Sequence, residues 1–226
     1  MRIILVRHGE PDYEKDCLTD NGRVQAAAVA ERLEPEGIEA IYTSPMGRAV
    51  ETATALAKRI GVTELTRLPW MRELSWGGKD GMPVYAEGHP WDCANRMIQL
   101  GEDVLSPDWQ ENPLFRHNRV VEEAARTSAG TDAWMEMLGY VREGAYYRCT
   151  RTEEAQHTVA LFCHGGSSSA MLARLLNLTF PYVCATLHMP FTGVTIIRLG
   201  RTPGQLVMPI VELASDSAHL GHSQEE

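Results

Sequence analysis

The sequence predicts an α/β fold of three layers: a mostly parallel central sheet, helices on both of its faces, and a helical insertion over the edge that carries the candidate site. First, strand-like apolar runs alternate with helical patterns along most of the chain. Second, the runs at 3–6 and 159–163 are continuously apolar, as in parallel strands buried on both faces. Third, 226 residues with 44% hydrophobic side chains suffice for a single domain, 1–226, with its own core.

The N-terminal strand at 3–6 leads into a polar stretch and then a helix. Apolar residues recur there with helical spacing, at Ala26, Val29, Ala30 and Leu33. Pro35 and Gly37 end this helix, and residues 38–43 form the second expected strand.

A second helix is expected directly after that strand. Ser44 and Pro45 fit its N-cap and first turn, and Gly61 fits its C-terminal end. A third strand is expected at 65–68.

The segment at about 82–130 interrupts the alternation. It contains four prolines and two expected helices, near 92–100 and 114–128, so we interpret it as a cap-like insertion and not as a separate domain. A further helix is expected at 132–148. Its apolar stripe would be Trp134, Met137, Leu138, Val141 and Ala145.

The C-terminal part returns to strands separated by a helix. We expect a strand at 159–163, a helix at 167–176, and adjacent strands at 194–199 and 206–211. From about residue 214 the chain is polar and acidic, and it is expected to fray.

Composition excludes several classes of protein. Lys plus Arg is 21 and Asp plus Glu is 30, a formal net charge of −9, which argues against a general nucleic-acid binder. No apolar run approaches the roughly 18 residues that span a bilayer, and Arg7 closes the short N-terminal run too early for a signal peptide. The five cysteines form no C-x-x-C pair, so we expect a cytoplasmic protein with reduced thiols.

Polar side chains follow several expected strands at their carboxyl ends, where open α/β sheets bind ligands. These side chains are Arg7, His8, Arg48, Glu73 and His164. Gly9 and Gly165 let the backbone approach a ligand closely, and the helix after Gly166 directs free N–H groups at the same place. The pattern predicts a site for an anion at this edge of the sheet.

Five motifs in order carry a resemblance to a known family. They are LVRHGE at 5–10, LTDNGRVQA at 18–26, IYTSPMGRAVETA at 41–53, MRELSWGGKDG at 71–81 and CHGG at 163–166. Over roughly residues 2–200 the chain resembles the histidine phosphatase superfamily, the phosphoglycerate-mutase-like proteins.

The resemblance implies a role for each matching residue. The catalytic residues would be His8, Glu73 and His164, and the substrate-binding residues would be Arg7, Arg48, Gly9 and Gly165. His8 would take the phosphoryl group as a phosphohistidine, and Glu73 would protonate the leaving group. No metal and no cofactor are expected, because phosphoryl transfer requires mainly positioning and charge stabilisation, which arginine supplies. The expected partner is a phosphorylated small molecule, and the oligomeric state is undefined.

Two departures from the family pattern bear on the reaction. Pro11 stands where the family often has Ser or Thr, which removes a secondary phosphate contact. The chain also lacks the paired arginines with which cofactor-dependent mutases hold a phosphoglycerate carboxylate. We therefore expect hydrolysis of a phosphomonoester, with mutase-type phosphoryl transfer as the alternative.

Other chemistries can be weighed against the same sequence. A cysteine phosphatase would need C-x5-R, but the sixth residue after Cys163 is Ser169, and neither an Asp-x-Asp pair after a strand nor G-x-S-x-G is present. His8, His164 and Glu73 could form a two-His-one-carboxylate metal site, although neighbouring arginines disfavour a bound cation. A catalytically inactive phosphate-binding regulatory module is the remaining alternative.

Overall fold

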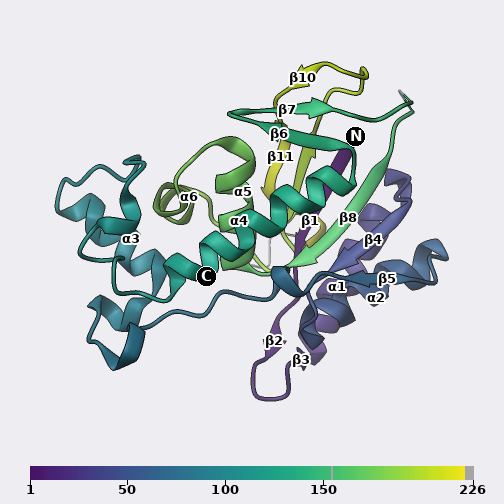
Figure 1. The fold of residues 1–226 in the computed structure, drawn as a ribbon. Helices are drawn as coiled ribbons and strands as arrows, with labels where there is room; N and C mark the ends of the chain where they lie inside the picture. Colours follow the sequence, from purple (N-terminus) through teal and green to yellow (C-terminus); the bar gives the residue numbers. More distant parts are fainter. Residues whose placement is uncertain (154, 222–226) are drawn as a thin grey trace.

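A computed structural model of the chain describes residues 1–153 and 155–221 (Figure 1). Within these residues a six-stranded sheet has the order β11-β9-β1-β8-β4-β5. Its strands are β1 (Arg2–Arg7), β4 (Ala40–Thr43), β5 (Leu65–Arg67), β8 (Thr158–Cys163), β9 (Val194–Arg198) and β11 (Ile210–Asp216). β1, β8, β4 and β5 are parallel, whereas β9 and β11 pair antiparallel at one side. The predicted α/β fold with a mostly parallel sheet is confirmed.

The central position of β1 explains its continuous apolar sequence. Ile4 lies opposite Ala160 of β8 on one side and Ile196 of β9 on the other. Because side chains alternate along a strand, Ile3 and Leu5 enter one core while Ile4 and Val6 enter the other.

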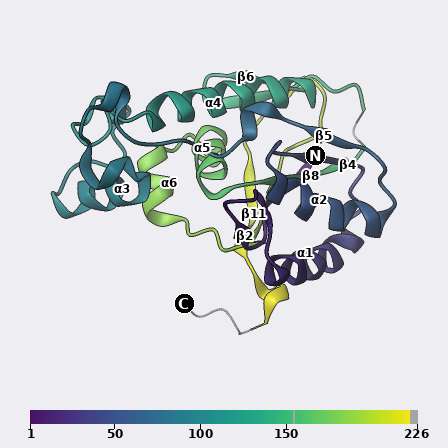
Figure 2. The same cartoon turned by 90° about the horizontal axis from the view of Figure 1, so that it is seen from below.

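Two helical layers cover the sheet (Figure 2). On one face α1 (Asp20–Leu33) and α2 (Gly47–Ile60) pack on Ile4, Val6 and Phe162. On the other, α4 (Val120–Met137) and α5 (Gly165–Leu176) pack on Leu5 and Leu161. α3 (Pro90–Gln99) and α6 (Phe180–Thr186) lie against each other beside this layer. No helix in the described ranges is long and apolar enough to cross a membrane.

The expected start of α2, with Ser44 as its N-cap and Pro45 as its first residue, is wrong by two residues. The helix begins at Gly47, and the side chain of its N-cap residue, Met46, does not cap the helix by a hydrogen bond. Ser44 and Pro45 lie before it, which frees the Ser44 hydroxyl for a contact elsewhere. The expected end is confirmed, because Gly61 follows the helix with a φ of 74°.

The prediction of a helix at 132–148 is wrong after residue 137, where the helix ends. α4 is continuous from Val120 to Met137, so it also crosses the expected end of the insertion at residue 130. A hairpin follows, formed by β6 (Tyr140–Glu143) and β7 (Tyr146–Cys149). Tyr140 and Tyr147 are fully buried, and aromatic residues at such positions favour strands over a helix.

The C-terminal strands differ from the expectation. The 206–211 run is divided between two sheets: β10 (Leu206–Val207) pairs with β7, and β11 begins at Ile210 and pairs with β9. The prediction that the chain frays from about residue 214 is wrong for residues 214–221, which have a defined structure. β11 continues to Asp216, where Arg32 forms an ion pair with the Asp216 carboxylate. Residues 222–226 lie outside the described part of the chain.

The polar stretch 10–20 contains a short hairpin of β2 (Pro11–Asp12) and β3 (Cys17–Leu18). Thr19 then caps α1, because its hydroxyl accepts the Gly22 N–H at 2.9 Å. The turn of this hairpin lies beside the start of α2, because the carboxylate of Asp16 in the turn accepts the Gly47 N–H at 2.7 Å.

Candidate active site

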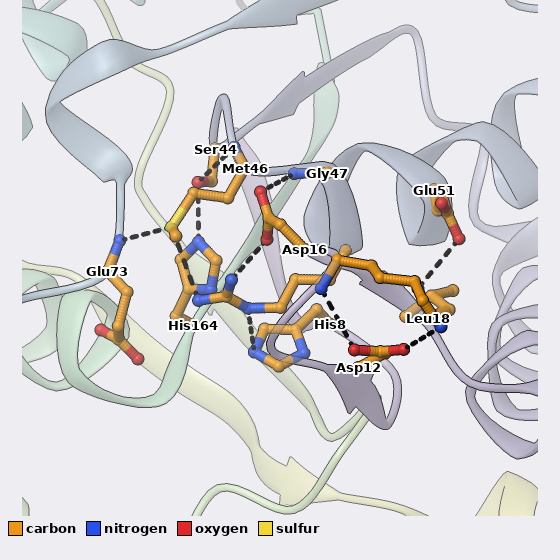
Figure 3. A network of polar contacts seen from close by, with 12 residues as sticks. His8, Asp12, Asp16, Leu18, Ser44, Met46, Gly47, Glu51, Glu73 and His164 are labelled. Carbon is orange, nitrogen blue, oxygen red and sulfur yellow. Dashed lines mark hydrogen bonds and ion pairs between the residues drawn. The ribbon is translucent and has the colours of Figure 1, made fainter.

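The site forms where β1, β4 and β8 end (Figure 3). His8 follows β1 and His164 follows β8, and their ring centroids lie 5.0 Å apart. Arg48, in the first turn of α2, reaches both His8 and the β2–β3 turn. The structure thus brings His8, His164 and Arg48 together, as the strand-end argument predicts; they are 2%, 0% and 4% exposed.

The two nitrogens of His8 have different partners. Nδ1 lies 2.7 Å from the Gly9 carbonyl oxygen, which can only accept, so Nδ1 carries the proton. Nε2 accepts the Arg48 Nε–H at 3.3 Å and therefore holds the lone pair. Burial, and to a lesser degree the charges of Arg7 and Arg48, lower the pKa of His8 to about 3. The ring is neutral, and its nitrogen lone pair is on Nε2, where it accepts the Arg48 N–H.

Gly9 positions the His8 ring. Its N–H donates to Thr52 Oγ1 at 3.1 Å, which ties the backbone beside His8 to α2. A Cβ at Gly9 would lie 2.6 Å from the Gly22 carbonyl oxygen, so no larger residue fits without displacing the backbone of α1.

Arg48 is held by an internal carboxylate. Its Nη1 donates to Asp16 Oδ1 at 2.5 Å, while Nη2 reaches the Met46 sulfur at 3.5 Å. The Arg48 guanidinium also lies over the Tyr13 ring, 5.4 Å from its centroid. These contacts fix the guanidinium beside His8.

His164 contacts the freed hydroxyl of Ser44. Ser44 Oγ lies 2.7 Å from Nε2 of His164 and accepts the Met46 N–H at 3.3 Å. In the tautomer whose Nε2 accepts the Ser44 hydroxyl hydrogen, the neutral ring carries its proton on Nδ1. Burial is the main cause that lowers the pKa of His164 well below its ordinary value. Among the described residues Nδ1 has no hydrogen-bond partner although it is buried.

Arg7 has an unused donor as well. Its Nη1 donates to the Met189 carbonyl at 2.5 Å, and its guanidinium lies 4.3 Å from the centroid of the Phe191 ring. Its buried Nε has no partner in the described part of the chain. Orphaned donors on Arg7 and His164 are what a site for an anionic oxygen requires.

Glu73 lies at the N-terminus of α5. Its carboxylate accepts the N–H groups of Leu74 and Ser167 at 2.9 Å each and of Gly166 at 3.2 Å. A Cβ at Gly166 would lie 2.7 Å from Glu73 Oε1, so glycine permits this approach. Burial raises the pKa of Glu73, while the three N–H donors and the Arg7 charge oppose that rise.

A pocket of about 270 Å³ opens beside these groups. Its lining includes Arg7, Glu73 and Gly165 of the predicted site. The remaining lining residues are Tyr13, Trp76, His89, Trp91, Ser169, Leu187, His188 and Met189. Trp76 and Trp91 thus bring two indole rings to the pocket.

Sequence reasoning missed Asp16 and Ser44 as parts of the site. Ser44 was interpreted as a helix cap, although its place at a strand end was the available signal. Asp16 lies in a polar stretch, and only the folded hairpin brings it to Arg48. His188 also lines the pocket, and no motif in the sequence marks it.

The alternative metal site receives no support. Within the described residues, no group of three or more His, Cys, Asp or Glu side chains could hold a metal ion.

The profile of the histidine phosphatase superfamily (branch 1) matches residues 3–209 of the chain. The chain belongs to this superfamily, and it is an enzyme of the phosphatase class.

Individual relatives span the same length. A protein named probable phosphoglycerate mutase GpmB, from Yersinia enterocolitica, is 26% identical over 97% of this chain and 95% of its own. A phosphoserine phosphatase from Entamoeba histolytica, solved with 3-phosphoglyceric acid, matches with a TM-score of 0.61 and 22% identity, over 97% of this chain and 98% of its own. A mycobacterial glucosyl-3-phosphoglycerate phosphatase, solved with inorganic phosphate, matches with a TM-score of 0.64 and 24% identity, over 96% and 98%. At these identities, the two structures support the fold alone.

Proposed function

We propose that the protein hydrolyses a small phosphomonoester, without a metal, through a phosphohistidine on Nε2 of His8. The observation that carries this proposal is the contact of 2.7 Å between Nδ1 of His8 and the Gly9 carbonyl oxygen. A neutral imidazole with its proton on Nδ1, directed to the Gly9 carbonyl, keeps the Nε2 lone pair next to the Arg48 guanidinium. A neutral ring can attack phosphorus without first losing a proton.

In the first step Arg7, Arg48 and the Nδ1–H of His164 hold the phosphoryl oxygens. A phosphoryl oxygen takes over the Arg48 N–H, which releases the Nε2 lone pair. Nε2 attacks phosphorus, the ester P–O bond breaks, and its electron pair stays on the leaving oxygen. Glu73 supplies the proton to that oxygen, since its raised pKa favours the protonated acid.

In the second step a water molecule attacks the phosphohistidine. Glu73, now ionised, takes a proton from the water, the P–N bond breaks, and the electron pair returns to Nε2 of His8. Inorganic phosphate leaves, and both groups regain their starting protonation.

The pocket size and the relatives' names support a small-molecule substrate. A volume of about 270 Å³ lies at the small end of the range for small-molecule pockets. The structural relatives are phosphatases of small phosphorylated molecules by name. We assign the segment at about 82–130 as the cap, because Trp91 and His89 belong to it and line the pocket.

The test is hydrolysis of p-nitrophenyl phosphate by wild type, His8→Ala and His157→Ala, each with and without a chelator. His8→Ala is expected to lower kcat by about a thousandfold or more, because the nucleophile is removed. His157 pairs with Glu39 before β8, outside the site, and its variant is the matched control. A wild-type phosphoenzyme that is acid-labile and alkali-stable would identify the phosphohistidine.

Turnover of His8→Ala within tenfold of wild type would contradict the proposal, as would loss of activity on chelation. Isomerisation of a phosphoglycerate faster than its hydrolysis would instead identify a mutase.

A further inference from the structure

The pocket has an aromatic wall that the proposed chemistry does not use. Trp76, in the loop after Glu73, meets His89 and Trp91, which lie at the start of α3. The Trp76 ring lies 5.3 Å from His89 at 87° and 6.5 Å from Trp91 at 84°. His89 and Trp91 are 5.3 Å apart at 37°. The two indoles therefore form a right-angled corner and not a box closed on several sides.

This corner adjoins the phosphoryl-binding groups. A Cβ built on Gly165 would lie 3.6 Å from Trp91 Cζ2 and 3.8 Å from the Arg7 Cζ. The indole and the guanidinium thus approach the same point of backbone. Trp76 follows three residues after Glu73, the proposed proton donor to the leaving oxygen. The leaving group of a phosphomonoester held by Arg7 would therefore lie in the aromatic corner.

The charged side chains that line the pocket restrict the charge that this leaving group can carry. Arg7 is the one Lys or Arg side chain among the described residues that line the pocket, and the proposed function assigns it to the phosphoryl group. Arg48, deeper in the site, is paired with Asp16. The rest of the lining is aromatic, apolar or polar without fixed positive charge, and it includes the Glu73 carboxyl. A second anionic group on the substrate would lose hydration there and find no further Lys or Arg partner among the described lining residues, which is unfavourable.

We propose that the alcohol part of the substrate is a planar aromatic ring without a second anionic group. The proposal rests on the proposed function, because it takes the phosphoryl group to be held by Arg7. A flat ring stacked on one indole presents its edge to the other, and both arrangements are favourable for aromatic pairs. Phosphoglycerates and phosphoserine, which carry a carboxylate, fit this corner poorly.

The test compares esters whose leaving groups are all alkyl alcohols, so that ring recognition is separated from leaving-group reactivity. The four substrates are 2-phenylethyl phosphate, butyl phosphate, 3-phosphoglycerate and phosphocholine. Because a ring stacks on an indole more favourably than an alkyl chain does, kcat/KM for the phenylethyl ester is expected to exceed that for the butyl ester by about tenfold. In Trp91→Ala the two esters should have nearly equal kcat/KM values. In Trp91→Phe most of the preference for the phenylethyl ester should remain. Tyr146→Ala, which changes an exposed ring on β7 away from the pocket, should leave the ratio unchanged.

Several outcomes would overturn the inference. One is a kcat/KM for 3-phosphoglycerate equal to or above that for the phenylethyl ester. Another is an equal fall in kcat/KM for the phenylethyl and butyl esters in Trp91→Ala, which would indicate a structural role for this ring. Preference for phosphocholine would show that the corner binds a cation.

Failure of the proposed function would be recognised separately. If wild type hydrolyses neither these esters nor p-nitrophenyl phosphate, calorimetric binding of the phenylethyl and butyl esters decides the inference. About tenfold tighter binding of the phenylethyl ester that is lost in Trp91→Ala supports it, and equal affinities contradict it.

Discussion

The carboxylate of Asp16 binds the guanidinium of Arg48 at the point where α2 begins. Asp16 Oδ1 accepts from Arg48 Nη1 at 2.5 Å, and Oδ2 accepts the Gly47 N–H at 2.7 Å (Figure 3). A guanidinium and a helix N-terminus are both groups that bind phosphate well. An internal anion therefore already engages Arg48, beside the nucleophile His8.

This relationship predicts that Asp16→Asn binds phosphate more tightly. Replacing the carboxylate by an isosteric neutral amide removes its repulsion of an incoming phosphoryl group and weakens its hold on Arg48. We expect the inhibition constant of inorganic phosphate to fall about three- to tenfold, which corresponds to about 0.7–1.4 kcal/mol. The measurement is competitive inhibition of p-nitrophenyl phosphate hydrolysis.

Asp12→Asn is the matched control for this variant. Asp12 lies in the same hairpin, but its carboxylate pairs with Lys15 and not with Arg48. A rise of the phosphate inhibition constant in Asp16→Asn would mean that Asp16 mainly positions Arg48, and the competition argument would then be wrong.

The buried neutral His8 predicts a loss of stability in acid. Its pKa is about 3 in the folded protein, against about 6.5 for an ordinary histidine. Between these values the unfolded chain binds a proton that the folded protein does not. The free energy of unfolding therefore falls as the pH drops from 6.5 towards 3, by up to about 1.4 kcal/mol per pH unit for one proton.

The variant His8→Gln should reduce this dependence, because it removes the titrating ring. The measurement is urea unfolding of both proteins at about pH 6.5, 5.5 and 4.5, within the interval between the two pKa values. We expect a shallower slope of unfolding free energy against pH in the variant. His164 shifts in the same direction, so some acid sensitivity should persist. Equal slopes would show that His8 is protonated in the folded state over this range.

Comparison of sequence and structure shows which features local patterns could reveal. His8 and His164 were found because each follows a buried apolar strand, and adjacent parallel strands bring their carboxyl ends to one edge. Glu73 was predicted as a site residue from its motif. Its contact with Gly166 in the first turn of α5 joins residues that are 93 positions apart. The positions of the strand ends therefore predicted that His8 and His164 lie together.

The predictions that failed concern features that depend on tertiary contacts. The apolar spacing across 132–148 fits a helix as well as a hairpin, and burial of Tyr140 and Tyr147 against the core decides between them. Asp16 reaches Arg48 across 32 residues because the turn of a short hairpin places it there. No pattern within a short window encodes either contact.

The position of Glu73 predicts how its removal depends on the leaving group. Glu73→Gln keeps the size of the side chain but cannot donate a carboxyl proton to the leaving oxygen. General acid catalysis contributes about a hundredfold or more where the leaving alcohol is poor, and little where it is good. We therefore expect the rate of His8 phosphorylation to fall about a hundredfold or more with butyl phosphate, and less than about tenfold with p-nitrophenyl phosphate.

Two measurements make this result interpretable. Burst kinetics separate phosphorylation of His8 from hydrolysis of the phosphoenzyme, in which Glu73 acts as base for either substrate. The thermal midpoint reports the structural cost, because the amide nitrogen that Glu73→Gln introduces would face an N–H group that the carboxylate now accepts from Leu74, Gly166 or Ser167. Equal losses of phosphorylation rate on the alkyl and aryl esters would remove Glu73 from the role of proton donor, whatever the change in stability.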